Sequence, residues 1–353
     1  MKAQKFVAIP PGAIMPGSLP RFKIYIPTQN RGNILWAKDG NQVTPDQISR
    51  LADTGMREVF IDLEEAVLYE EYLESNLGAI LSSESPSDDQ KAAVFSRVST
   101  NVVKGALETS FKSGKINTDT LERTERMIRN TLEFITESRS LQALAKMIGH
   151  DYQTYEHATK VLWFTMVFLN DNPDIIEQIQ PGYDALDKEQ RREILRQCGV
   201  SAMLHDIGKA YVTPEIINKS GALSEAEWGI MRCHPLYGLA MLLDTDLPVF
   251  VKKAVLEHHE DFQGGGYPMM IEGQKISVLA RVLRIIDVFD AMTSRRPYKE
   301  PLAPLNAVKI MAGVPRDENN SEADPRDQGM RQCFDEQLLR KFIVLLGTAR
   351  LGS

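Results

Sequence analysis

The first 65 residues alternate between apolar and polar positions in the manner of short β-strands. Residues 22–27 alternate in this way, and residues 34–40 follow them as the expected partner in a β-hairpin. Thr44-Pro45-Asp46-Gln47 has the pattern of a helix-capping box, so a short helix is expected as far as Thr54. Another strand is expected over residues 57–62. The pattern predicts a small α+β module over residues 1–65, which we interpret as regulatory.

Between residues 66 and 148 the apolar positions recur at the spacing of helices. Helices are expected over residues 69–81, 91–111 and 118–148. Leu121, Ile128 and Ile135 recur every seven residues, but the pattern weakens afterwards and does not establish a sustained coiled coil. We interpret residues 66–148 as a helical linker region, and the helices over residues 64–148 as a surface where a homodimer can form.

Residues 149–353 contain almost nothing but helical patterns joined by short loops. Helices are expected over residues 155–169, 187–204, 249–260, 276–292 and 335–346. A further helix begins at the capping box Ser224-Glu-Ala-Glu227 and is expected to end near His234. Residues 276–292 are apolar nearly all round, as in a buried central helix, yet they include Asp287 and Asp290. Residues 311–330 are expected to form a loop.

The composition is that of an ordinary soluble protein. The 353 residues are 43% hydrophobic and 25% charged, and a chain of this length can form two domains with cores. The net charge of −7 argues against a general nucleic-acid binder. Three widely separated cysteines favour a reducing compartment, and no apolar run is long enough to span a bilayer. We therefore expect a cytoplasmic protein that binds neither DNA nor a membrane.

The stretch from His205 to Lys209 places an imidazole and a carboxylate at the end of an apolar segment. Charged side chains are costly there unless they are paired or bind a metal. Because neighbouring residues on a helix point about 100° apart, His205 and Asp206 can reach two sides of one cluster. The two oxygens of Asp206 can then bridge two metals, and Gly208 is expected to let the chain turn. A chance pairing in a packed core is the alternative.

All the histidines except His150 lie on predicted helices, which suits ligands that converge from several helices of a bundle. These histidines are His157, His205, His234, His258 and His259. Together with Asp206 and Asp287 they are too many for one tetrahedral zinc, but they suit two ions that share a bridge. A nitrogen and oxygen set without thiolate suits Fe, Mn, Ni, Co or Zn, and spacing does not choose among them.

Residues from about 150 to 350 resemble the HD-GYP domain, a subgroup of the HD-superfamily metal-dependent phosphohydrolases that degrades cyclic di-GMP. The resemblance is carried, in order, by His157 in Tyr155-Glu-His-Ala, His205-Asp-Ile-Gly-Lys209, His234-Pro235, the stretch from His258 to Pro268 and the stretch from Asp287 to Lys299. It covers somewhat over half of the chain. It implies an all-α HD-type helical bundle over residues 149–353, behind the α+β module.

The resemblance also implies roles for the matching residues. The implied metal ligands are His157, His205, Asp206, His234, His258, His259 and Asp287, with Asp206 as the bridge. Lys209 would donate a proton to the leaving oxygen, so Asp206 and Lys209 are the implied catalytic pair. The implied substrate contacts are Tyr267, Arg296 and Lys299, with Gly265 and Gly266 in the Gly-rich loop. Asp290 is instead expected to accept hydrogen bonds within the bundle.

The implied activity is hydrolysis of cyclic di-GMP to linear pGpG, with further hydrolysis to GMP left open. Two divalent ions, Fe or Mn first and Ni, Co or Zn as alternatives, would generate a bridging hydroxide at neutral pH. Gln153 stands where some family members have an acidic ligand for a third metal, so two ions are favoured. The alternatives are hydrolysis of another cyclic dinucleotide or nucleotide, and a catalytically quiet cyclic di-GMP receptor. Either way, signalling partner proteins are expected.

Overall fold

The structure is a computed structural model, and it describes residues 5–28, 32–56, 58–84, 86–136, 154–219, 221–295, 300–313 and 330–348. The chain divides into two compact units, Met1–Val98 and Ser99–Ser353. The division falls inside α3 (Asp88–Ser113), within the stretch predicted as a helical linker. The three-part division of the chain at residues 65 and 148 stays a prediction.

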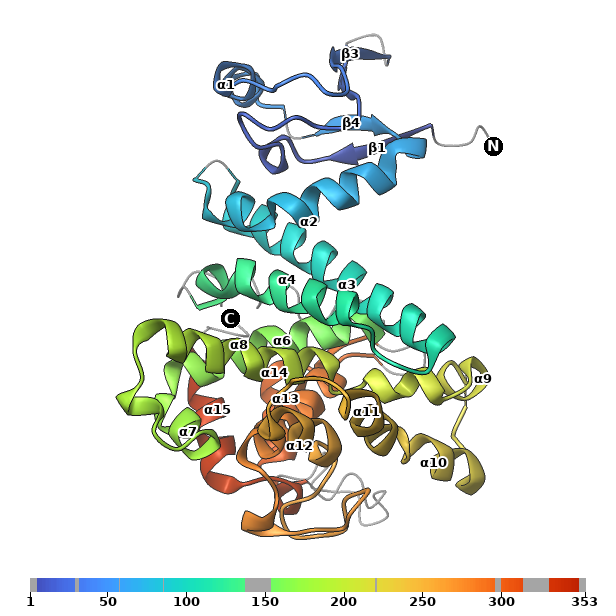
Figure 1. The fold of residues 1–353 in the computed structure, drawn as a ribbon, viewed down its shortest axis with the longest axis vertical. Helices are drawn as coiled ribbons and strands as arrows, with labels where there is room; N and C mark the ends of the chain where they lie inside the picture. The colour runs from blue at the N-terminus through green and yellow to red at the C-terminus, as the bar shows by residue number, and fades with distance from the viewer. Residues whose placement is uncertain are drawn as a thin grey trace. The chain divides into compact units, whose positions relative to one another are not determined.

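The first unit contains a four-stranded antiparallel sheet, in the order β1-β4-β2-β3, within its described residues (Figure 1). The strands are β1 (Phe6–Ile9), β2 (Ile24–Pro27), β3 (Asn33–Ala37) and β4 (Val59–Asp62). β2 and β3 form the predicted hairpin. The capping box also forms at α1 (Pro45–Asp53), where the backbone N–H of Gln47 donates to Thr44 Oγ1 and that of Thr44 donates to Gln47 Oε1.

The second helix, α2 (Ala66–Ser82), packs its aromatic side chains against the core of the first unit. The Phe22 ring makes edge contacts with the rings of Tyr69 and Tyr72, at centroid distances of 5.5 and 5.4 Å. The Tyr72 hydroxyl accepts a hydrogen bond from the Met15 backbone N–H at 2.8 Å. Phe22 is completely buried, so these contacts form the apolar centre of the module.

The second unit is a bundle of helices. They are α4 (Thr118–Thr136), α6 (Thr154–Asp171), α7 (Pro173–Ile179), α8 (Lys188–Leu204), α9 (Pro214–Ile217), α10 (Glu225–Met231), α11 (His234–Leu242), α12 (Val249–Glu257), α13 (Val278–Thr293), α14 (Pro304–Met311) and α15 (Glu336–Thr348). α6 and α12 each pack against both α8 and α13 at the centre. A small sheet followed by a mostly helical remainder confirms the predicted fold class.

α13 is the central helix that its apolar sequence predicts. It packs against α6, α7, α12, α14 and α15, which together leave little of its surface exposed. Leu283, Ile286 and Phe289 are at most 1% exposed. Because α13 is covered by so many helices, its two aspartates must lie inside the bundle, where each needs a partner.

Two predicted helix ends differ from the structure, and a third extends beyond the described residues. The helix predicted over residues 249–260 ends at Glu257, so His258 and His259 follow α12 instead of lying on it. The capping box at Ser224 starts α10, but α10 ends at Met231, and His234 begins α11 instead of ending a helix. Pro235 explains the difference, since proline lacks a backbone N–H and is tolerated in the first turn of a helix. The helix predicted over residues 118–148 is observed as far as Thr136, and residues 137–148 lie outside the described residues.

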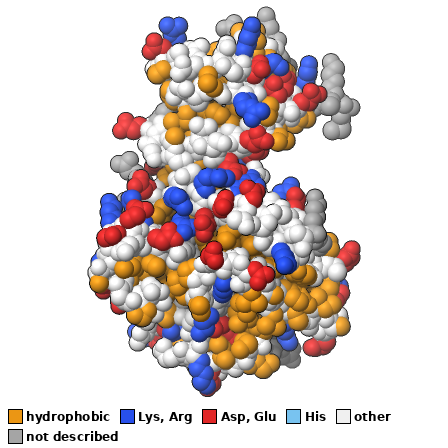
Figure 2. All heavy atoms as spheres, in the orientation of Figure 1, with side chains coloured by type: hydrophobic (Ala, Val, Ile, Leu, Met, Phe, Trp, Pro, Cys, Tyr) orange, Lys and Arg blue, Asp and Glu red, His pale blue; other side chains and the backbone are white. Residues whose placement is uncertain are grey.

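One face of the protein carries mixed charges. Figure 2 shows Lys and Arg side chains interspersed with Asp and Glu over one face, with no extended basic region among the described side chains on it. A phosphate backbone attracts proteins through clustered basic side chains, and this face does not present them. Among the described residues, no helix combines the length and the apolar character needed to cross a membrane.

Gly208 lies in the short 3-10 helix η4 (Ile207–Tyr211), which packs against α11. A Cβ atom at this position would lie 1.9 Å from the carbonyl oxygen of His234 and 2.4 Å from the backbone nitrogen of Gly238. The φ angle of Gly208 is not positive. Glycine is therefore required because the backbones of η4 and α11 approach each other closely. The sequence had instead suggested that this glycine lets the chain turn.

We predict that Gly208→Ala lowers the free energy of unfolding by about 1–3 kcal/mol, because η4 and α11 must move apart to admit the methyl group. Urea unfolding followed by circular dichroism measures the change. Gly229→Ala is the matched control, since a Cβ at that position in α10 would have no atom within 4 Å. The control should retain or slightly gain stability. Equal losses in both variants would contradict the explanation.

Candidate metal centre

The side chains predicted as metal ligands come together from separate elements of the bundle. His157 lies on α6, His234 begins α11, and Asp287 lies on α13. His205 and Asp206 directly follow α8, while His258 and His259 directly follow α12. These side chains lie in two groups of possible ligands, the first being Asp206, His234, His258 and His259, and the second His157, His205 and Asp287. Within each group, one ligand atom per residue lies within 4.8 Å of the others.

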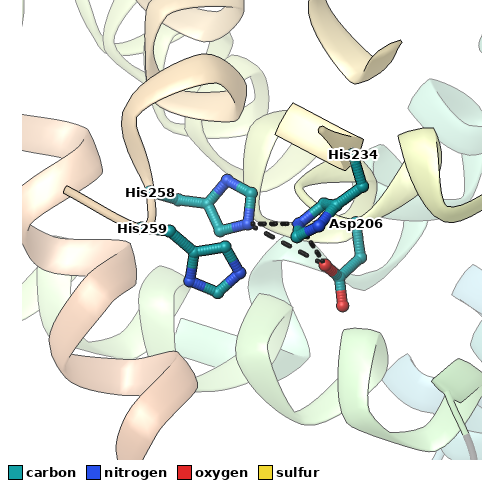
Figure 3. A group of neighbouring side chains, drawn as sticks. All are labelled: Asp206, His234, His258 and His259. Atoms are coloured by element: carbon teal, nitrogen blue, oxygen red, sulfur yellow. Dashed lines mark hydrogen bonds and ion pairs between the residues drawn. The ribbon is translucent and has the colours of Figure 1, made fainter. Parts of the chain in front are cut away.

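The Asp206 carboxylate lies between the two groups. Its Oδ1 atom is 3.1 Å from His234 Nε2 and 3.8 Å from His258 Nε2. Its Oδ2 atom is 3.4 Å from His205 Nε2 and 3.9 Å from His157 Nε2. Figure 3 shows the first group, with His234 and His258 beside the carboxylate. One oxygen facing each group is the arrangement that a bridging carboxylate requires.

Three of the imidazoles are oriented by the helix ends on which they lie. Each places its Nδ1 atom 2.7–2.8 Å from the carbonyl oxygen three residues earlier, which belongs to Ala202 for His205, Met231 for His234 and Val255 for His258. These carbonyls lie in the last turns of α8, α10 and α12. The last carbonyls of a helix have no later backbone N–H in that helix to donate a hydrogen bond to them. A carbonyl only accepts, so Nδ1 carries the hydrogen and Nε2 keeps its lone pair for a metal.

His157 is oriented by a side chain from another helix. Its Nδ1 atom lies 2.7 Å from Asp290 Oδ2, and its Nε2 atom lies 3.1 Å from Asp287 Oδ1. Asp290 is one helical turn beyond Asp287 on α13, and it accepts the hydrogen bond expected of it from the sequence. The two aspartates of the apolar helix thus contact opposite edges of one imidazole ring.

The charges at the site favour metal binding at neutral pH. Burial alone would raise the pKa of Asp206, but the positive charge of Lys209 and the neighbouring imidazoles hold this pKa well below its usual range. Asp287 is affected in the same way, with His157 as the main opposing partner. Burial lowers the pKa of His258 to about 4 and also lowers that of His259. The carboxylates are therefore ionised and these imidazoles neutral, as metal ligands must be.

Two polar atoms at the centre of the site fit a metal. His205 Nε2 and Asp206 Oδ1 are buried and have no hydrogen-bond partner among the residues that the structure describes. Leaving such atoms unsatisfied in a protein interior costs free energy, so each unpaired atom calls for an explanation. Imidazole nitrogens and carboxylate oxygens, without thiolate, suit first-row divalent metals. The residues present therefore fit a divalent metal centre.

The other predicted site residues have differing outcomes. Lys209 Nζ is 2.5 Å from Asp206 Oδ2, so this ammonium lies beside the ligand groups. The Tyr267 ring stacks on the His259 ring, at a centroid distance of 4.7 Å and an interplanar angle of 33°. Arg296, Lys299, Gln153 and His150 lie outside the described residues.

The backbone of the Gly-rich loop itself requires the two glycines that were predicted to contact substrate. Gly265 has a φ of +90°, a conformation that side chains rarely adopt. A Cβ atom on Gly266 would lie 2.2 Å from the backbone nitrogen of Asp261. The loop therefore folds back on the end of the histidine pair, and it needs these glycines whatever ligand is bound.

The sequence reasoning missed charged residues that surround the ligands. Arg284 Nη1 lies 3.5 Å from His259 Nδ1, and Arg284 also pairs with Asp261 at 2.6 Å. Lys160 is 2% exposed and lies one turn after His157 on α6. Both residues could have been found in the sequence, because each is a basic residue three positions from a predicted ligand within a largely apolar helix.

Comparisons with known proteins agree with this geometry. Residues 182–320 match the HD domain family, a range that includes six of the seven candidate ligands and begins after His157. A Pseudomonas aeruginosa protein named cyclic di-GMP phosphodiesterase is 27% identical over 316 residues, which cover 87% of this chain and 69% of that protein. A Xanthomonas campestris protein named cyclic di-GMP phosphodiesterase response regulator is 38% identical over 110 residues, or 31% of this chain and 29% of that protein.

Other relatives carry a different substrate in their names. A Vibrio cholerae protein named 3′3′-cGAMP-specific phosphodiesterase 3 is 36% identical over 111 residues, or 31% of this chain and 24% of that protein. The chain therefore spans less than a third of two of these three relatives. A solved structure of an HDG"Y"P protein from Bdellovibrio bacteriovorus matches 97% of this chain and 99% of its own, with a TM-score of 0.56 and 14% identity. Residues 182–320 thus match an HD domain, and the chain has a fold similar to that of the solved HDG"Y"P protein.

Proposed function

We propose that the protein is a metal-dependent phosphodiesterase that hydrolyses cyclic di-GMP to linear pGpG. The observation that carries the proposal is the pair of ligand groups with the Asp206 carboxylate between them. Relatives from several bacteria that are named cyclic di-GMP phosphodiesterases support this substrate. The proposed reaction opens the cyclic dinucleotide at one phosphodiester bond.

The HD domain and the clustered ligands indicate that the protein binds divalent metal. The proposal goes further and assigns two ions, one to each group, with Asp206 as their common ligand. Fe or Mn is favoured, and Ni, Co or Zn suits the same donor atoms. Such a pair of ions, when bound, supplies Lewis acidity toward the phosphodiester and a hydroxide nucleophile at neutral pH.

The chain's own residues would divide the remaining tasks. Lys209 lies at the edge of the ligand groups with its side chain 17% exposed, so its ammonium can meet both Asp206 and a substrate. We assign it the proton that the leaving 3′ oxygen requires. Tyr267 covers the His259 ring, and its hydroxyl is assigned to a phosphate oxygen. Arg296 and Lys299 keep their proposed role in binding phosphate, for which guanidinium and ammonium groups are suited.

A second candidate substrate is 3′3′-cGAMP. Three relatives carry this substrate in their names, and they are 33–39% identical to this chain over 100 to 126 residues. The same ligand groups and the same Lys209 would serve either cyclic dinucleotide, because the reacting phosphodiester is alike in both. A catalytically quiet receptor is less well supported, since it would be expected to lack ligands and all seven are present.

The first unit is proposed to regulate the site and not to supply chemistry. In its described residues, no group of three His, Cys, Asp or Glu side chains is arranged to hold a metal. The predicted module over residues 1–65 and the helices over residues 64–148 are the parts assigned to sensing, dimerisation and partner proteins.

We expect the purified protein to contain about two divalent ions per chain, measured by inductively coupled plasma mass spectrometry. Asp206→Asn should reduce this content and abolish turnover, because an amide is a neutral and weaker ligand between the two groups. Asp244→Asn is the matched control, since the Asp244 side chain is 88% exposed in the same unit. Full metal content in Asp206→Asn would contradict the bridging role.

We expect metal-replete protein to convert cyclic di-GMP to pGpG faster than it converts 3′3′-cGAMP, as measured by chromatography of the products. The reverse order of kcat/KM would establish the second candidate substrate. Binding of both dinucleotides without cleavage would reject the phosphodiesterase and favour the receptor.

We expect Lys209→Met to lower kcat by about 10²–10⁴-fold, since a positioned proton donor contributes this much. The metal content should stay at the wild-type level, because the ammonium is not a ligand. Lys115→Met serves as the control, because the Lys115 side chain is 76% exposed. An unchanged kcat in Lys209→Met would remove the lysine from the proposed mechanism.

A further inference from the structure

One candidate ligand differs from its neighbours in how it is held. His205, His234 and His258 each donate to a carbonyl of the preceding helix turn, so the backbone alone sets their orientation. His157 lies inside α6 and donates instead to Asp290, a residue 133 positions away on α13. The orientation of this ring therefore depends on a side chain that can be changed without altering any helix end.

Asp290 belongs to a chain of buried polar side chains. Asp290 Oδ1 accepts a hydrogen bond of 2.9 Å from the Ser294 hydroxyl, whose oxygen accepts a hydrogen bond of 2.9 Å from Lys160 Nζ. Lys160 Nζ is also 3.9 Å from Asp290 Oδ1. The exposed fractions are 1% for His157 and Asp290 and 2% for Lys160 and Ser294. Water is thus excluded from all four side chains.

The chemistry of these groups fixes which atom donates and which accepts in each hydrogen bond of this network. An ammonium only donates and a carboxylate only accepts, so the Ser294 hydroxyl must accept from Lys160 and donate to Asp290. Asp290 must then accept from His157 Nδ1, which leaves the Nε2 lone pair toward Asp287 Oδ1 at 3.1 Å and Asp206 Oδ2 at 3.9 Å. Asp287 and Asp290 lie one turn apart on α13, which packs against α6, and Ser294 directly follows the end of α13.

We propose that Asp290, with Ser294 and Lys160, positions His157 and thereby sets the affinity of one of the two metal positions, that of His157, His205 and Asp287. This inference rests on the proposed metal centre. A carboxylate partner fixes the tautomer of a ligating imidazole and makes its free nitrogen a better donor. The other group keeps its ligands when Asp290 is changed, because His234 and His258 are held by backbone carbonyls.

The buried lysine has a specific part in this network. A carboxylate enclosed in a bundle is costly unless an opposite charge compensates it, and the Lys160 ammonium lies 3.9 Å from Asp290 Oδ1. The ammonium and the hydroxyl therefore hold the Asp290 carboxylate in place as the acceptor for His157. Lys160 and Ser294 are positioning residues that act through Asp290 and His157.

The test is a titration of metal-free protein with Mn²⁺, with the number of ions bound and their affinities measured by isothermal calorimetry. In Asp290→Ala we expect one ion to bind as in the wild type and the other at least tenfold more weakly, within the range of about 10–100-fold for such partners. Asp290→Asn keeps the shape and one acceptor oxygen, so it should weaken the same ion by less. If Asp290→Ala does not fold, Asp290→Asn alone decides.

Asp335→Asn is the matched control, because it also removes one buried carboxylate that contacts α13. Asp335 is 8% exposed and pairs with Arg281 at 2.6 Å. This variant should lose stability yet bind both ions as the wild type does. Wild-type affinities for both ions in the Asp290 variants, or equal weakening in Asp335→Asn, would overturn the inference and leave the proposed function standing. Wild-type protein that binds no Mn²⁺ would overturn the proposed function itself.

Discussion

The placement of one carboxylate, that of Asp206, is the constraint on which the site depends. Its two oxygens face different sets of imidazoles, and Asp206 is 5% exposed just beyond the end of α8. A negative charge in such a place requires positive partners, and Lys209 alone contacts only one of its oxygens. Asp206 Oδ1 has no hydrogen-bond partner among the described residues, so the arrangement is best explained by divalent metal held beside the carboxylate.

The helices of the second unit hold their candidate ligands mostly at their ends. A helix leaves its last carbonyls without intrahelical partners, and a histidine placed just beyond can satisfy one of them while aiming its other nitrogen inward. α8, α10 and α12 each use this device, through Ala202, Met231 and Val255. The backbone contact at Gly208 then holds the start of α11 close to Asp206. Fold and site are therefore built from the same contacts.

Much of this could be predicted from residue patterns. The hairpin, the capping boxes and the buried α13 followed from local rules. The resemblance indicated seven candidate ligands, and the fold brings them together in two groups. The end of α10 was misplaced because the pattern of apolar residues continues across Pro235 into α11. The reason for Gly208 and the links from Lys160 to Asp290 could not be predicted, since both arise between segments far apart in the chain.

The most direct test of the account is anomalous scattering from crystals of metal-replete protein. The account predicts two peaks, one on each side of the Asp206 carboxylate, the first among His234, His258 and His259 and the second among His157, His205 and Asp287. A single peak, or peaks remote from Asp206, would contradict it.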